Sequence, residues 1–378
     1  MAIKKSRQKG FAIIFVMVFI ALIMSIVADV VYETQITAKN SLVQQDQMFA
    51  KLAVKTGLEF GKFIIILNKL TLNYQNNPLI PIPKNIYKVL NGQPIGAESF
   101  EKLKGLTGID FSTVLSPEIQ NGLKAMKGYF VLKVSSENTK FNLNLLNQST
   151  YSVEAKNALM RIFSHPDTTK FLAIYGYTPA QIVNGLLNYI KISVTDSSVN
   201  SIAMEQYNKL GLTYLPKHAA LESLEELRRI PGFEVDDIYN MFSPYFTVWP
   251  INVQAGSLNI NSAPPELISA IMTPQTQDPN QQSWDKFEDY RQQNSFAVNT
   301  MKEFFTKNLP DYASDNETEL IRKNIFGITD TVYKIECRGV YNNVEKNFLV
   351  VLQLDKSAPT SAATTSLPFH ILYSQWID

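Results

Sequence analysis

The sequence predicts an α+β fold in which a long N-terminal helix packs on an antiparallel sheet and a large helical domain is inserted into that sheet. Residues 11–70 contain no proline and repeat apolar residues at helical spacing. Alternating apolar residues predict strands near residue 130 and again towards the C-terminus. Between these strands, residues 149–245 show helical spacing interrupted by prolines, which predicts the inserted helical domain.

Length and composition indicate an ordinary folded protein of two or three domains. Of the 378 residues, 45% are hydrophobic and 18% are charged, unlike a disordered chain. The formal charge is +1, and because residues 1–10 carry four basic side chains, the rest of the chain has a charge of −3. Such a mildly acidic body gives no electrostatic reason to bind nucleic acid. Cys337 is the only cysteine, so no disulfide can form within the chain.

An apolar run near the N-terminus predicts a membrane-spanning helix. Phe11–Ala28 contains no charged residue and only one polar side chain, Ser25. As an α-helix the run would be about 27 Å long, enough to cross the apolar core of a bilayer. The basic residues before it are expected to stay in the cytoplasm, so everything after Asp29 is expected on the other side of the membrane.

The helical pattern continues beyond this run. Between Val30 and Leu70, apolar residues return at steps of three and four, as in an amphipathic helix. One continuous helix from residue 11 to Leu70 would be about 90 Å long. A secretory signal peptide needs no such continuation, and Ser25–Ala28 is a poor approximation to its cleavage site.

The later elements are predicted from turns and alternation. The segment GYFVLKVSSENTKFNLNLLN predicts two strands joined by a turn at Ser136–Thr139, and Asn342-Asn343 predicts a hairpin before the last strand, FHILYSQWI. Ser223 and Glu226 form a capping-box pattern that predicts a helix start. The predicted domains are a leader (1–10), the N-terminal helix (11–70, with 11–28 as its transmembrane part), a connector with the first strands (71–145), a mainly helical insertion (146–310, with a strand segment near 246–261) and C-terminal sheet strands (311–378).

One pattern occurs twice in the predicted insertion. FNLNLLNQSTYSVEA (141–155) and LNINSAPPELISA (258–270) each place asparagines alternately with apolar residues, ahead of an acidic residue that opens a helix. Alternation in a strand puts the amides on one face. There they can satisfy backbone groups of irregular chain nearby. The sequence therefore predicts the same strand-to-helix corner at two places.

The N-terminus resembles that of type IV pilins and pseudopilins: a basic leader, Gly10-Phe11, then the long helix. In that family a membrane peptidase cuts after the glycine and methylates the new N-terminal residue, which implies cleavage between Gly10 and Phe11 and an N-methylated Phe11. The family usually has a glutamate where this chain has Phe15, and that glutamate is thought to pair with the terminal amine of the neighbouring subunit. A tip subunit has no neighbour ahead of it, and an unpaired carboxylate in lipid is costly. Phe15 therefore marks a tip position.

Further motifs are similar to those of minor pseudopilin K of the type II secretion system, and they follow in the same order: FNLNLL, LLNYI, SLEELRRIPGF, SPYFTVWP and LNINSAPPELISAI. The resemblance covers residues 10–70 and 128–378. It implies a pilin-like helix and sheet carrying an inserted helical domain.

The resemblance also implies a function. The expected protein is a non-enzymatic subunit at the pseudopilus tip that initiates or caps assembly for protein export across the outer membrane. Its expected partners are the I and J minor pseudopilins, the prepilin peptidase and the inner-membrane assembly platform, and contact with secreted cargo is left open. It would be a single-pass protein of the bacterial inner membrane with its body in the periplasm.

No catalytic or metal site is expected. The three histidines lack the spacing of zinc ligands, and no nucleotide-binding motif occurs. Calcium has been seen in the helical domain of the resembled family, whose LLNYI motif precedes an aspartate-rich stretch. Here that stretch retains only Asp196 and Glu205 as acids, whereas calcium takes six to eight oxygen ligands. Calcium at these two residues is thus the one cofactor that the sequence leaves open.

The main alternative is a DNA-binding minor pilin of a competence system or type IV pilus. RRIPGFEVDDIY resembles the helix-hairpin-helix of DNA-binding proteins, and LNINSAPPELISAI looks like the opening of competence DNA receptors. Such hairpins need free backbone amides and basic residues close to the phosphate. Gly232 is instead followed by Glu234, Asp236 and Asp237, so a structural hairpin is expected. A membrane-anchored envelope protein of another kind is the third interpretation.

Overall fold

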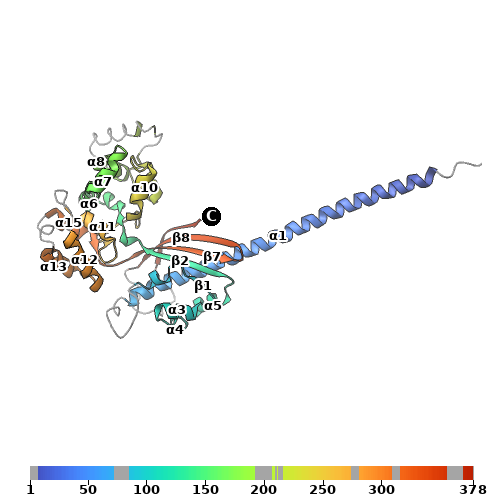
Figure 1. Ribbon diagram of the computed structural model, residues 1–378, viewed down its shortest axis with the longest axis horizontal. Coiled ribbons are helices and arrows are strands. Elements are labelled where there is room, and N and C mark those ends of the chain that lie inside the picture. Colours follow the sequence, from blue (N-terminus) through green and yellow to red (C-terminus); the bar gives the residue numbers. More distant parts are fainter. Residues whose placement is uncertain are drawn as a thin grey trace, which may run out of the picture. The chain divides into compact units, whose positions relative to one another are not determined.

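The computed structural model describes residues 7–71, 85–191, 207–208, 211, 216–273, 281–308, 316–355 and 369–377 (Figure 1). The chain divides into two compact units. The first consists of Met1–Lys133, Glu336–Leu349 and Trp376–Asp378, and the second of Val134–Ile335 and Val350–Gln375.

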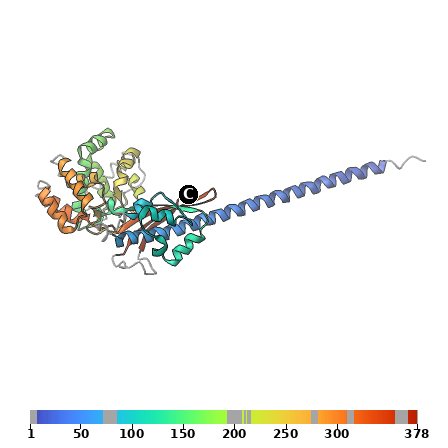
Figure 2. The same ribbon diagram turned by 60° about the horizontal axis from the view of Figure 1, so that its bottom comes forward.

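A single helix, α1 (Arg7–Thr71), opens the first unit and confirms the predicted continuous helix. Its N-terminal half extends away from the small helices of the same unit, as both views show (Figures 1 and 2). Those helices are α2 (Ile86–Leu90), α3 (Phe100–Thr107), α4 (Phe111–Val114) and α5 (Pro117–Ala125).

The main sheet has five strands in the order β1-β2-β7-β8-β9. These strands are β1 (Pro94–Gly96), β2 (Tyr129–Ser136), β7 (Val332–Tyr341), β8 (Val344–Leu354) and β9 (Phe369–Ile377). The predicted hairpin at Asn342-Asn343 joins β7 to β8, and the predicted last strand is the edge strand β9. A long helix with a sheet and a large helical insertion is the predicted α+β fold.

The C-terminal half of α1 is buried within the first unit. Its apolar face carries Ala50, Val54 and Phe60, each without exposed surface. The ring of Phe60 lies 5.8 Å from the ring of Phe111 and 5.8 Å from that of Phe130, measured between centroids. Burial of this face removes apolar surface from water and stabilises the helix on the unit.

Two glycines permit a close approach in this core. A Cβ atom on Gly57 of α1 would lie 2.6 Å from the sulfur of Cys337 and 2.9 Å from the ring of Phe130. A Cβ atom on Gly339 of β7 would lie 2.3 Å from the carbonyl oxygen of Ala50. Because these distances are far below van der Waals contact, any side chain at either glycine would push α1 away from the strands.

The second unit is mainly helical. Its helices are α6 (Ser152–Ser164), α7 (Pro166–Ile174), α8 (Pro179–Ile190), α10 (Asp236–Phe242), α11 (Pro265–Met272), α12 (Gln281–Gln293), α13 (Val298–Asn308) and α15 (Asn316–Ile325). Short 3-10 helices are η2 (Glu137–Thr139), η3 (Leu143–Asn147), η4 (Leu224–Arg229) and η5 (Ser243–Tyr245).

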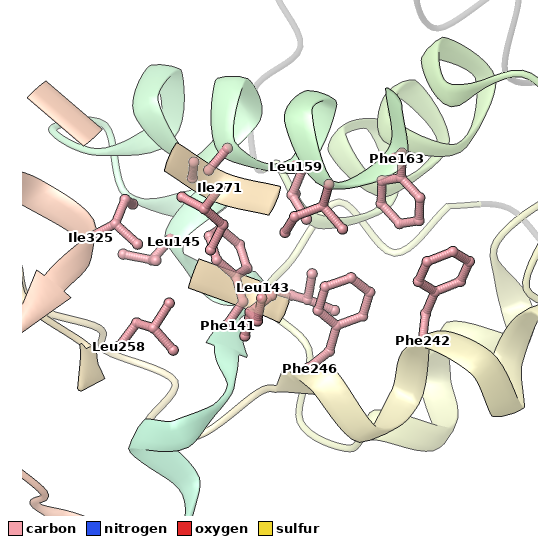
Figure 3. Packing of buried hydrophobic residues seen from close by; sticks show 14 of the residues in the cluster. Phe141, Leu143, Leu145, Leu159, Phe163, Phe242, Phe246, Leu258, Ile271 and Ile325 are labelled. Carbon is pink, nitrogen blue, oxygen red and sulfur yellow. The ribbon is translucent and has the colours of Figure 1, made fainter. Parts of the chain in front are cut away.

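Apolar side chains from these helices form one core (Figure 3). Phe163 of α6 lies at its aromatic end, with ring centroids 4.8 Å from Phe242 and 6.0 Å from Phe246. Leu145 and Leu258 come from the two asparagine-rich corners, and both are fully buried. Distant segments of the chain therefore share one apolar interior.

Two very short parallel bridges connect the corners to distant chain. β3 (Phe141–Asn142) pairs with β4 (Phe246–Thr247), and β5 (Leu258–Asn259) pairs with β6 (Phe326–Gly327). The strand predicted after the turn at Ser136–Thr139 is thus only two residues long. It belongs to a separate two-stranded sheet, not to that of β2. The two strands predicted on either side of this turn are present, but the second is short because the 3-10 helix η3 follows it at once.

One helix start was predicted from its capping pattern, and another lies where only strands were predicted. Ser223 and Glu226 form the predicted capping box, but the element that they open is the 3-10 helix η4. The range 311–378, predicted as sheet strands, also contains α15, whose first turn carries the acidic residues Glu317 and Glu319. Acidic side chains near a helix N-terminus are stabilised by the helix dipole, which favours a helix here.

Candidate assembly site

The N-terminal half of α1 presents an apolar surface with nothing packed on it in the described chain. Every residue from Phe11 to Gln45 is exposed. This is the one helix among the described residues that is long and apolar enough to cross a membrane, by length and composition. A folded protein rarely leaves so large an apolar surface in water, and this helix could anchor the chain in a membrane.

The predicted processing residues lie at the start of this surface. Gly10 lies within α1 and is followed by Phe11, whose exposed fraction is 74%. Phe15 is 68% exposed. Residues four apart lie on one face of a helix, so Phe11, Phe15 and Phe19 form a phenylalanine stripe, which the sequence analysis did not single out. A glutamate in place of Phe15 would interrupt this stripe with a carboxylate.

In the second unit, Asn144 holds the first asparagine-rich corner. Its side-chain nitrogen Nδ2 donates to the carbonyl oxygens of Leu221 at 2.9 Å and Val248 at 2.7 Å. Its oxygen Oδ1 accepts from the backbone N–H of Leu221 at 2.8 Å. Asn142 contributes by accepting from the backbone N–H of Asn144 at 2.9 Å. The amide of Asn144 thus pairs with Leu221 as a neighbouring strand would.

Asn261 makes the same arrangement at the second corner. Its Nδ2 donates to the carbonyl oxygen of Phe296 at 3.0 Å, and its Oδ1 accepts from the N–H of Phe296 at 2.7 Å. It also donates to the carbonyl oxygen of Ile328 at 3.2 Å. Asn259 accepts from the N–H of Asn261 at 3.0 Å, as Asn142 does for Asn144. The predicted repetition and its amide-to-backbone bonds are therefore confirmed, but the strand at each corner is only two residues long, and Asn144 lies in the 3-10 helix η3.

The hairpin that resembles a DNA-binding motif is closed by its own acids. Gly232 has φ +99°, and a Cβ atom there would lie 2.2 Å from the side chain of Ile182, so glycine is required. Its N–H donates to the carboxylate of Glu234, which also accepts from the hydroxyl of Tyr177. Burial, together with this carboxylate, raises the pKa of Tyr177.

Neighbouring charges point to the same conclusion. The guanidinium of Arg228 binds the carboxylate of Asp236, and the hydroxyl of Tyr175 donates to Asp237 at 2.5 Å. The hydrogen bond to Asp237 raises the pKa of Tyr175. The backbone amide of Gly232 and the guanidinium of Arg228 are therefore already bonded to carboxylates of the chain itself, which disfavours the DNA-binding alternative.

The weak calcium candidates, Asp196 and Glu205, lie outside the described residues. Within the described ranges, no three His, Cys, Asp or Glu side chains lie close enough to hold a metal ion. His165 lies between α6 and α7, and His370 of β9 has its Nε2 atom 3.7 Å from Asp355. These histidines do not lie in a common site.

The fold and this site define a class of protein. Its N-terminal helix is able to cross a membrane and is followed along the chain by the strands of a sheet. A separate helical unit is inserted in the sequence between those strands. Residues 139–251 match the family model described as "Type II secretion system (T2SS), protein K". This segment runs from the first asparagine corner through the Gly232 hairpin to β4. The predicted resemblance to protein K is therefore confirmed for these residues.

A solved structure is also similar to this chain. It is a chain of the crystal structure of the GspK-GspI-GspJ complex from the enterotoxigenic Escherichia coli type 2 secretion system, with 16% identity and a TM-score of 0.46. The match covers 67% of this chain and 81% of that chain. No curated protein matches the chain.

Proposed function

We propose that the protein is a non-enzymatic minor pseudopilin of the K type, which occupies the tip of a type II secretion pseudopilus. The observation that carries this proposal is the match of residues 139–251 to protein K of that system. The exposed apolar segment that begins at Phe11 supplies the surface through which such a subunit would join its neighbours. Initiation or capping of the filament would then support protein export across the outer membrane.

In this proposal the chain inserts into the inner membrane with residues 1–10 in the cytoplasm and its body in the periplasm. The prepilin peptidase cuts between Gly10 and Phe11 and methylates the new amine. The helix then packs with the helices of the I-type and J-type minor pseudopilins on the assembly platform. The solved complex of GspK with GspI and GspJ is the reason for naming these partners.

The first test is the N-terminus of the mature protein, measured by intact mass with and without the prepilin peptidase. The expected product begins at Phe11 and is heavier by one methyl group, and it appears only when the peptidase is present. Gly10→Ile, which alters the residue before the cut, should block processing, whereas Gln8→Ala serves as a matched change within the leader. An unprocessed N-terminus, or cleavage near Ala28, would refute assignment to the pilin pathway.

The second test concerns the tip position. Phe15→Glu places a carboxylate within the apolar run with no subunit ahead to supply an amine, which is unfavourable. This variant should recover less of the I and J partners on co-purification from membranes, while Phe15→Leu, which keeps the site apolar, should recover them normally. Normal recovery by Phe15→Glu would contradict the tip assignment without affecting the processing result.

A further inference from the structure

The half of α1 that packs in the first unit carries a row of lysines on one side. Between Gln47 and Thr71 the charged residues of the helix are Glu59 and the four lysines Lys51, Lys55, Lys62 and Lys69. At 3.6 residues per turn these lysines fall within about 40° of one another around the helix axis, along about 27 Å of its length. They form one basic strip, here called the lysine face.

Most of the positive charge on the lysine face is not paired within the described chain. Lys62 is bound to Glu59, with 2.7 Å between its Nζ atom and the carboxylate. Lys51, Lys55 and Lys69 are exposed, and among the described residues no carboxylate is bound to any of the three. Three aligned cations without a counter-charge favour an acidic partner and repel a basic one.

Exposed apolar side chains lie beside the lysine face. Met48 and Leu52 of α1 are 52% and 47% exposed. With Lys51 and Lys55 they occupy positions i, i+3, i+4 and i+7, which share one side of a helix. Trp376 of β9 is 41% exposed, and the Nζ atom of Lys51 lies 6.0 Å from the centre of its ring. Tryptophan and methionine are enriched at protein interfaces, so this surface fits a protein better than a free anion.

Distance along α1 argues against lipid headgroups as the partner. The apolar run ends at Ala28, and Lys51 lies about 35 Å further along the same unbroken helix. Attraction between exposed charges is screened over about 8–10 Å at ordinary salt concentrations. With the apolar run upright in a bilayer, the lysine face would therefore be too far from the headgroups to bind them.

We propose that the lysine face binds an acidic helix of another protein, whose carboxylates meet Lys51, Lys55 and Lys69 and whose apolar side chains cover Leu52. A helix that lies along α1 has the same rise per residue, so acidic residues three, four or seven positions apart can meet the lysines in turn. This inference rests on the lysine face alone and does not depend on the function proposed above.

The experiment uses the full chain in a non-ionic detergent and follows the fluorescence anisotropy of a labelled helical peptide. In the probe peptide, glutamates three and four positions apart line one side, with leucines beside them and glutamines elsewhere. The first reference peptide has the same composition with the glutamates spread around the helix, and the second has glutamine in place of every glutamate. The probe should bind saturably and more weakly as salt increases, and both references should bind much less.

Variants and a crosslinker test whether the lysine face holds the probe. Lys55→Gln and Lys69→Gln should each weaken binding about two- to fivefold, the usual effect of an exposed ion pair. Lys39→Gln is the matched control, because Lys39 is an exposed lysine of α1 that lies about 140° around the helix from the lysine face. A water-soluble carbodiimide, which joins a carboxylate to a nearby amine, should link the probe to Lys55 and not to Lys39.

The inference is overturned if the probe does not bind at millimolar concentration, if the first reference peptide binds as tightly, or if Lys39→Gln weakens binding as much as Lys55→Gln. A further titration tests a lipid surface as the occupant. With the chain in phosphatidylcholine vesicles at physiological salt, replacing part of the lipid by phosphatidylglycerol should leave the affinity for the probe unchanged. Loss of binding there would assign the lysine face to anionic lipid and would also overturn the inference.

Discussion

A methyl group added to Gly57 tests how closely α1 must approach the strands of the first unit. In Gly57→Ala the new Cβ atom would lie 2.6 Å from the sulfur of Cys337 and 2.9 Å from the ring of Phe130. Neither neighbour is free to leave, because Cys337 and Phe130 are both buried. The helix or the strand must therefore shift.

Overpacking of this kind costs about 1–3 kcal/mol. A loss of that size multiplies the population of the opened unit by roughly 5 to 150, since about 1.4 kcal/mol corresponds to a factor of ten. The better helix propensity of alanine is favourable by about 1 kcal/mol, so the net loss is at most about 2 kcal/mol, which corresponds to an increase of up to roughly 30-fold.

Cys337 itself provides the assay, because it is the only thiol in the chain. Burial raises its pKa to about 12, so in the folded unit it is both covered and protonated. A thiol reagent at pH 8 should therefore react only after the unit opens, and its rate should follow the opened population. Gly57→Ala should react faster than the unaltered chain, by up to about 30-fold.

Two further variants separate the clash from a local effect on the thiol. Gly339→Ala would place its Cβ atom 2.3 Å from the carbonyl oxygen of Ala50 and 2.8 Å from Val54 in the same core, and should accelerate labelling similarly. In Gly105→Ala, in α3, no neighbouring group lies within 4 Å of the added Cβ atom, so this variant should not accelerate labelling. Equal labelling rates for Gly57→Ala and Gly105→Ala would refute the close-approach argument.

Two other predictions concern the asparagine corners and the buried thiol. Asn144→Ala and Asn261→Ala each remove three hydrogen bonds to distant backbone and should lower the unfolding free energy by about 2–4 kcal/mol, whereas the exposed Asn240→Ala should change it little. Calorimetry of the three variants checks this, and indistinguishable melting temperatures would contradict it. Because the folded pKa of Cys337 lies above its ordinary value near 9, the contribution of the thiol to stability is full below pH 9 and is lost as pH rises towards 12. The free energy of unfolding, measured with urea, should therefore fall more steeply with pH over this range in the unaltered chain than in Cys337→Ala. Equal slopes in the two proteins would contradict this prediction.

Local signals in the sequence predict the elements of this protein well. The absence of proline and the helical spacing predicted α1, and the Asn342-Asn343 pair predicted the β7–β8 hairpin. The capping box at Ser223 and Glu226 is present as expected. Each of these features depends on residues a few positions apart, which is the range at which periodicity and capping act.

Contacts between distant residues could not be predicted in this way. The amides of the corners were expected to bond nearby backbone, but the sequence does not indicate that Asn144 would select Leu221 and Asn261 would select Phe296. The two-residue parallel bridges are equally non-local and carry no alternation of their own. Likewise, nothing in the sequence around Gly57 indicates that its Cα atom packs against Cys337 of strand β7, which leaves no room for a side chain.

The candidate site shows the same division. Gly10, Phe11 and Phe15 could be singled out from the sequence because they stand at fixed places relative to the leader. The bonds that close the Gly232 hairpin could not, because Tyr177, which donates to Glu234, lies 57 positions before it and no local pattern relates the two residues.

The unbroken course of α1 has a mechanical consequence. A helix of 65 residues with no proline has no hinge at which to bend sharply, so it behaves as a stiff rod. A push or twist applied at the phenylalanine stripe would travel along the rod and reach the rest of the first unit where Ala50, Gly57 and Phe60 are buried. Because α1 and strand β7 are in close contact at Gly57 and Gly339, a displacement of the helix would move strand β7 with it.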